Sequence, residues 1–89
     1  MSVYSMNKIL YLTENDAAFR QRIQTEAEAV VKEFPLTDEE FRAFTSGDIL
    51  AVFNMGVHPF LLSNFSRHGL FGVTDKNYFP RIRGEEKVS

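Results

Sequence analysis

The chain has 89 residues and a mass of 10.2 kDa, which is enough for one domain but not for two. It contains no cysteine, which excludes disulfide bonds, thiolate metal sites and a thiol nucleophile, and its 44% hydrophobic content excludes a disordered chain. The net charge of −2 argues against a surface for nucleic acid. No apolar run approaches the roughly 20 residues that cross a bilayer and no secretory leader begins the chain, so we expect no membrane partner and a cytoplasmic location.

Apolar residues recur at helical spacing in the first third of the chain. This period predicts a first helix from about residue 2 to residue 12. A second helix is predicted from Asp16, whose carboxylate would cap its first turn, to Phe34, with a break near Thr25. Pro35 must end this helix, because proline disfavours the helical conformation of the residue before it and has no N–H to donate.

Two capping signals follow in the middle of the chain. Thr37 and Glu40 form a capping-box pattern, in which the Thr37 hydroxyl accepts from the Glu40 N–H and the Glu40 carboxylate accepts from the Thr37 N–H. Gly47 is predicted to end the short helix that follows, and Asp48 to cap the next one. In that next helix we expect a buried stripe that includes Phe53.

A last helix is predicted between His58-Pro59 and His68-Gly69, and the character of the chain changes after it. From residue 73 onward, Asp, Asn, Pro and Gly residues discourage regular structure, although the segment stays rich in aromatic side chains. We therefore predict an all-α fold. It consists of a small orthogonal multi-helix domain of about five short helices over residues 1–72 and an irregular aromatic C-terminal tail over residues 73–89.

The histidines and carboxylates supply the residue types of a two-histidine, one-carboxylate iron site. In one continuous helix, however, His58 and His68 would lie roughly 15 Å apart, which is too far to share a metal ion. They are therefore predicted to act at the two ends of that helix, and the acids at positions 38–40 to stabilise a first helical turn. The serines lack the glycine context of a nucleophile elbow, and the dispersed glycines argue against a phosphate-binding loop. The residues thus predict neither a catalytic group nor a metal site in this chain.

Side chains beyond the predicted helices are the remaining candidates for function. Aromatic residues there are expected at an interface or in a lid rather than in the core, and the basic residues that alternate with them are candidates for the same interface. These candidates are Phe71, Tyr78, Phe79, Arg81 and Arg83. An alternative takes the two short central helices as a helix-turn-helix with both arginines on DNA, and the acidic first half of the chain argues against it.

The segment LTDEEFRAFTSGDILAVFNMGVHPFLLSNF, residues 36–65, resembles the LigA-type small (alpha) subunit of the extradiol aromatic-ring-opening dioxygenases, the type found in protocatechuate 4,5-dioxygenase. A short helix and an acid-started helix in the same order before it extend the resemblance to residues 5–70. The resemblance implies an all-helical cap, with the iron ligands and the catalytic base in a separate large subunit or fused domain. It implies no cofactor in this chain, Fe(II) in the partner, and an aromatic lid near the partner's active-site mouth, for which Phe71 is the nearest match.

The function expected from these features is that of a non-catalytic small subunit, or cap, of an Fe(II)-dependent extradiol ring-opening dioxygenase acting on catecholic aromatic acids. Its partner would be a large catalytic subunit. The alternative is a stand-alone helical module that associates with copies of itself and has no catalytic partner. A domain of this size without disulfides is marginal as a monomer, which is consistent with either partner.

Overall fold

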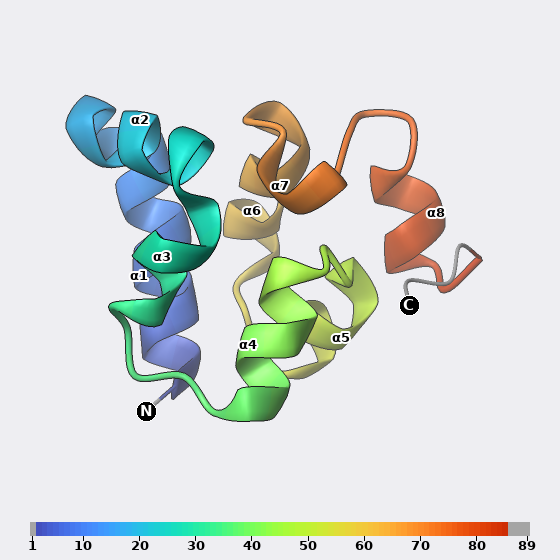
Figure 1. Cartoon of the computed structure of the whole chain (residues 1–89). Coiled ribbons are helices and arrows are strands. Elements are labelled where there is room, and N and C mark those ends of the chain that lie inside the picture. The colour runs from blue at the N-terminus through green and yellow to red at the C-terminus, as the bar shows by residue number, and fades with distance from the viewer. Residues whose placement is uncertain (1, 86–89) are drawn as a thin grey trace.

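In the computed structural model, which describes residues 2–85, all the regular structure of that range is helical (Figure 1). The elements in chain order are α1 (Ser2–Asn15), α2 (Ala17–Thr25), α3 (Ala27–Lys32), α4 (Asp38–Thr45), α5 (Ile49–Asn54), α6 (Pro59–Leu62), α7 (Asn64–Arg67), the 3₁₀ turn η1 (Leu70–Gly72) and α8 (Tyr78–Ile82). The predicted all-α fold is confirmed. None of the helices in this range is long and apolar enough to cross a membrane.

Side chains cap the starts of α2, α4 and α5. Asp16 Oδ1 accepts from a first-turn N–H of α2 at 3.1 Å, and Asp48 Oδ1 does the same for α5 at 3.2 Å. At α4, Thr37 Oγ1 accepts from the Glu40 N–H at 3.1 Å while Glu40 Oε1 accepts from the Thr37 N–H at 2.7 Å. Both halves of the capping box are therefore present, and these local bonds set where the three helices begin.

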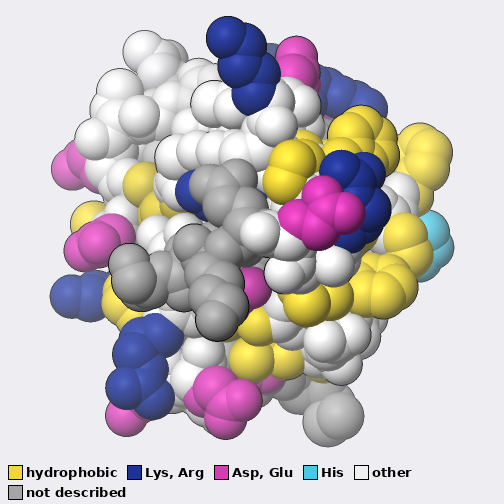
Figure 2. Space-filling model, turned by 90° about the vertical axis from the view of Figure 1, so that its right-hand side faces the viewer, with side chains coloured by type: hydrophobic (Ala, Val, Ile, Leu, Met, Phe, Trp, Pro, Cys, Tyr) yellow, Lys and Arg dark blue, Asp and Glu magenta, His cyan; other side chains and the backbone are white. Residues whose placement is uncertain are grey.

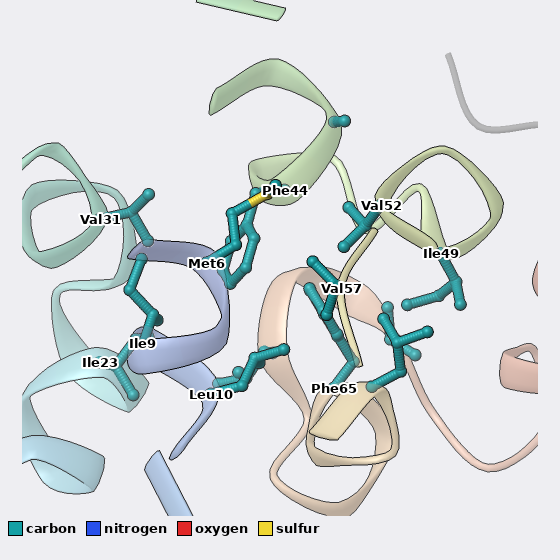
Figure 3. Packing of buried hydrophobic residues seen from close by; sticks show 14 of the residues in the cluster. Met6, Ile9, Leu10, Ile23, Val31, Phe44, Ile49, Val52, Val57 and Phe65 are labelled. Carbon is teal, nitrogen blue, oxygen red and sulfur yellow. The ribbon is translucent and has the colours of Figure 1, made fainter. Parts of the chain in front are cut away.

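The centre of the hydrophobic core is one face of α1 (Figure 3). Met6, Ile9 and Leu10 are fully buried, and Ile9 points toward Ile23 of α2 and Val31 of α3. A fully buried side chain of this size contributes roughly 1.5–3 kcal/mol relative to an exposed one, so the α1 face is a major source of stability. The other fully or almost fully buried apolar residues are Ile23, Val30, Val31, Phe44, Ile49, Val52, Val57, Leu62, Phe65, Leu70 and Val73.

The first helix runs to Asn15, three residues beyond the predicted end. Its last turn is held by Arg20 from α2, whose Nε donates to the Thr13 carbonyl at 2.8 Å and whose Nη2 donates to the Glu14 carbonyl at 2.7 Å. These carbonyls belong to the last turn, where helical partners run out. A side chain from the next helix therefore stabilises the last turn of α1. The hydrophobic period cannot predict this stabilisation, because the bonds involve a polar side chain and backbone carbonyls.

The prediction of one helix between His58 and His68 is wrong, because the chain divides into α6 and α7 at Ser63. Ser63 Oγ donates to the Phe60 carbonyl at 3.2 Å, a local bond that competes with regular helix geometry. Asn64 is fully buried and its Nδ2 donates to the Leu10 carbonyl of α1 at 3.0 Å, which ties α7 to the core. His58 Nδ1 accepts from the Phe60 N–H at 3.1 Å and so caps α6.

Phe53 does not belong to the buried stripe of α5, because 40% of its surface is exposed. Ile49 and Val52, which are three residues apart and therefore share a helix face, are the fully buried residues of this helix. The short α5 thus presents a narrower apolar face to the core than predicted.

The segment after Val73 is not irregular throughout, because it contains α8. Asn77 organises the approach to this helix: its Oδ1 accepts from the Thr74 N–H at 2.7 Å and its Nδ2 donates to the Gly72 carbonyl at 3.0 Å. Pro80 is the third residue of α8, where the missing N–H would have had no helical partner, so proline is tolerated there. Figure 1 shows α8 beside α5, and the two helices are in contact. The predicted tail continues beyond the described residues at positions 86–89.

Candidate functional site

The site is centred on η1, the single turn that carries Phe71 between two buried anchors. Leu70 is 2% exposed and Val73 is fully buried, so the backbone is held on both sides of Phe71. Within the described residues, Phe71 is the one non-glycine residue with a positive φ, with φ 51° and ψ 40°. This left-handed conformation costs a residue with a Cβ roughly 1–2 kcal/mol and requires its surroundings to hold it. Such local strain is typical of functional positions.

The Phe71 side chain is half-buried, with one part against the core and the rest at the surface. Its ring lies 5.8 Å from the ring of Phe44 at an interplanar angle of 75°, an edge-to-face arrangement. Phe44 is fully buried and packs in turn on Phe65, with the ring centroids 4.9 Å apart. The core therefore fixes one edge of the Phe71 ring and leaves apolar surface available to a second molecule.

Three segments converge at Gly47, in the turn between α4 and α5. Gly47 is buried with φ 71°, and a Cβ there would lie 2.6 Å from the Phe71 carbonyl oxygen, 2.7 Å from Arg81 Nη1 and 2.9 Å from Val73 Cγ2. These separations leave no room for a side chain. Glycine is therefore required at this position for two reasons, the lack of space and the positive φ. Arg81 Nη1 also donates to the Gly47 carbonyl at 3.1 Å.

The structure separates the four tail residues predicted for a partner interface. Tyr78 and Arg81 are half-buried and face the domain, and burial raises the pKa of the Tyr78 phenol from its ordinary value of 10.0. Phe79 is 59% exposed, and its ring meets that of Tyr78 edge-to-face at 5.2 Å. Arg83 is exposed and donates to both carboxylate oxygens of Glu85, at 3.0 and 3.1 Å. Phe79 and Arg83 therefore lie at the surface, whereas Tyr78 and Arg81 contact other parts of this chain.

Sequence reasoning missed further exposed aromatic residues on other helices. Phe53 of α5 and Phe60 of α6 are 40% and 69% exposed, and α5 is in contact with both α6 and α8. Figure 2 views the molecule from the α8 side and shows hydrophobic side chains gathered on part of this face, with basic and acidic side chains among them. Helical spacing had suggested that Phe53 packs inward, but a helix as short as α5 does not fix by spacing which of its side chains face the core.

A second apolar surface lies along α1. Tyr4 and Tyr11 are 65% and 56% exposed, and with Leu12 and Leu61 they line a groove of about 330 Å³. The ammonium group of Lys8 lies 5.9 Å from the centroid of the Tyr4 ring, a cation–π distance. The period of α1 gave no signal of this groove, because tyrosine fits the exposed side of a helix as well as the buried one.

No group of three or more His, Asp or Glu side chains within residues 2–85 is arranged to hold a metal ion. His58 is exposed at the start of α6 and His68 follows α7. Burial, followed by the charges of Arg20 and Arg67, lowers the pKa of His68 from its ordinary value of 6.5, against an opposing effect of Glu14. The described residues therefore offer no fitting set of ligands for an iron ion.

The described residues define a small helical domain with exposed aromatic surfaces and a strained aromatic turn. Residues 6–87 match the family model described as aromatic-ring-opening dioxygenase LigAB, LigA subunit, and the chain belongs to this family. The match reaches well past residue 70, so the resemblance includes α8, which the sequence comparison over residues 5–70 had left outside. No curated protein and no solved structure matches the chain. The family is that of a subunit of an aromatic-ring-opening dioxygenase, which associates with a partner subunit.

Proposed function

We propose that this chain is the non-catalytic small subunit, or cap, of an Fe(II)-dependent extradiol ring-opening dioxygenase that acts on catecholic aromatic acids. The observation that carries the proposal is Phe71, a half-exposed aromatic ring on a strained backbone between two buried anchors, in a chain of the LigA family. A rigidly held ring at the surface is suited to forming one wall of a partner's active site.

The iron and the catalytic base are assigned to the large subunit. This assignment is supported by the side chains of residues 2–85, which do not gather into a ligand set. Fe(II) held by the partner would supply the chemistry that activates the ring and dioxygen. The part left to this chain is physical: Phe71 orients the ring of the substrate and excludes water, which strengthens local electrostatics and suppresses side reactions.

The contact with the large subunit is assigned to the surface of α8 and the residues after it. Phe79 supplies an exposed apolar side chain and Arg83 an exposed charge, while Tyr78 and Arg81 support the surface from within. Aromatic and arginine side chains are the usual anchors of protein interfaces. A partner that covers α8 also lies near η1, because Asn77 links the start of α8 to Gly72.

The test is co-expression with candidate large subunits, followed by co-purification and an iron-dependent ring-opening assay with protocatechuate as the probe substrate. In the complex, Phe71→Ala should lower turnover or change substrate preference and leave the iron content unchanged. Phe79→Ala should weaken assembly, with Tyr4→Ala as the control because Tyr4 is similarly exposed on α1. Equal weakening by both variants would contradict the assignment of the interface to α8, and a Phe71→Ala complex with native turnover would contradict the lid.

Self-association without a catalytic partner is the second candidate, and the apolar groove of α1 favours it. Sedimentation of the purified chain distinguishes the two functions. A dimer that is lost in Tyr11→Ala, together with failure of the chain to bind any large subunit, would support self-association. A chain that stays monomeric and ignores every large subunit would contradict both candidates.

A further inference from the structure

Arg81 joins α8 to Gly47, in the turn between α4 and α5 that lies close to the Phe71 carbonyl. Its Nη1 donates to the Gly47 carbonyl at 3.1 Å, across 34 positions of sequence. The same nitrogen and the Phe71 carbonyl oxygen both lie within 3 Å of the place where a Cβ of Gly47 would be. The guanidinium group and the Phe71 carbonyl therefore occupy one small space above a glycine that leaves it open.

The conformation of Phe71 needs such support. A left-handed backbone at a residue with a Cβ persists where the surrounding structure over-determines it. The ring is held by Phe44, and the neighbouring residues Leu70 and Val73 are held by the core. The carbonyl side of Phe71 is where Gly47 and Arg81 lie, so α8 is in a position to fix the peptide that orients the ring.

We propose that Arg81 is a positioning residue that holds the Phe71 backbone in its left-handed conformation, so that the docking of α8 sets where the Phe71 ring lies. The consequence for turnover rests on the proposed function of Phe71 as a lid. The effect on the backbone of the turn that carries Phe71 depends on this chain alone, so it is measured without any partner.

Amide hydrogen exchange of the full chain, read residue by residue by NMR, tests the loop. The reporter is the Val73 N–H, which donates to the Leu70 carbonyl at 3.0 Å across the turn that contains Phe71. In Arg81→Gln this amide should exchange roughly tenfold faster, the factor expected for the loss of one charge-assisted hydrogen bond, while core amides of α1 keep their native rates. Arg83→Gln is the matched control, because Arg83 is exposed next to α8 and pairs with Glu85.

The outcomes distinguish a specific effect of Arg81 on the turn that carries Phe71 from a loss of stability of the whole chain. An unchanged Val73 rate in Arg81→Gln, or an increase equal to that of the α1 amides, overturns the proposal. Arg81→Lys retains a donor for Gly47 but not the planar fork, so its Val73 rate should lie between the native and Gln rates. If Arg81→Gln does not fold, the Lys variant carries the test, and a native Val73 rate in it overturns the proposal.

A double-mutant comparison in the assembled enzyme, with protocatechuate as the probe, tests the effect on turnover. Arg81→Gln should lower kcat/KM, and it should add nothing in a Phe71→Ala background, because Arg81 acts through Phe71. An additive loss in that background overturns the positioning role. If Phe71→Ala leaves turnover native while Arg81→Gln still accelerates Val73 exchange, the lid function fails and the positioning of Phe71 by Arg81 stands.

Discussion

Two replacements of Phe71 separate the strain in its backbone from the packing of its ring. The half-buried ring contacts Phe44, and full burial of a phenylalanine is worth about 3–5 kcal/mol on truncation to alanine, so we expect Phe71→Ala to cost about 2 kcal/mol. Phe71→Gly loses the same packing but relieves a left-handed strain of roughly 1–2 kcal/mol, partly offset by the greater freedom of glycine in the unfolded chain. The glycine variant should therefore be more stable than the alanine variant by about 1 kcal/mol.

Urea unfolding followed by helical circular dichroism measures both free energies, and the order is the reverse of the usual one in helices, where alanine is the more stable. Phe44→Ala serves as the reference for a fully buried ring and should cost about 3–5 kcal/mol. A glycine variant less stable than the alanine variant would refute the left-handed backbone at Phe71. A Phe71→Ala cost as large as that of Phe44→Ala would make Phe71 a core residue and remove the basis for the lid.

Two further predictions concern local contacts. Thr37→Ala should lower the free energy of unfolding by about 1 kcal/mol, because it removes the acceptor in the capping box, and an unchanged melting curve would show that the box contributes nothing. The pKa of His68 is lowered from 6.5 by burial and by Arg20 and Arg67, so the folded chain binds this proton more weakly than the unfolded chain. The free energy of unfolding should therefore be undiminished by this histidine above pH 6.5 and should decrease as the pH falls below 6.5. His68→Gln should flatten the dependence of the free energy of unfolding on pH between about pH 7.5 and about pH 5.5. If the native chain and the His68→Gln variant showed the same dependence of stability on pH over that range, the lowered pKa of His68 would be contradicted.

Helix starts in this chain follow from the sequence because their causes are local. The Asp16, Thr37 and Asp48 side chains each bond to a backbone N–H three residues away, a distance that a sequence pattern contains in full. The break near Thr25 also occurs, between α2 and α3. The break at Ser63 was missed, because Asn64 is held by the carbonyl of Leu10, which is 54 positions away in sequence.

Burial in short helices is harder to predict from spacing. A helix of six residues such as α5 has fewer than two turns, so the period cannot distinguish Phe53 from Val52 as the inward residue. In α8, Pro80 and the preceding polar residues read as helix breakers, although proline is compatible with the first helical turn. In both helices the neighbour against which the helix packs decides which side chains are buried.

At the candidate site, too, contacts between residues distant in sequence could not be predicted from the sequence pattern. Phe71 could be selected from the sequence because it lies beyond Gly69, outside the helical stripes, but its strained backbone depends on packing that the sequence does not display. Gly47 was predicted as a helix end and does follow α4, but the close approach of the Phe71 carbonyl to it was not foreseen. Arg81 was predicted as a surface contact for a partner, yet it donates to the Gly47 carbonyl within this chain. A basic residue in an aromatic tail has the same local pattern whether it points outward or inward. The arrangement also makes the tail part of the unit that holds the lid, so a chain shortened after residue 72 would retain Phe71 without one of the side chains beside its backbone.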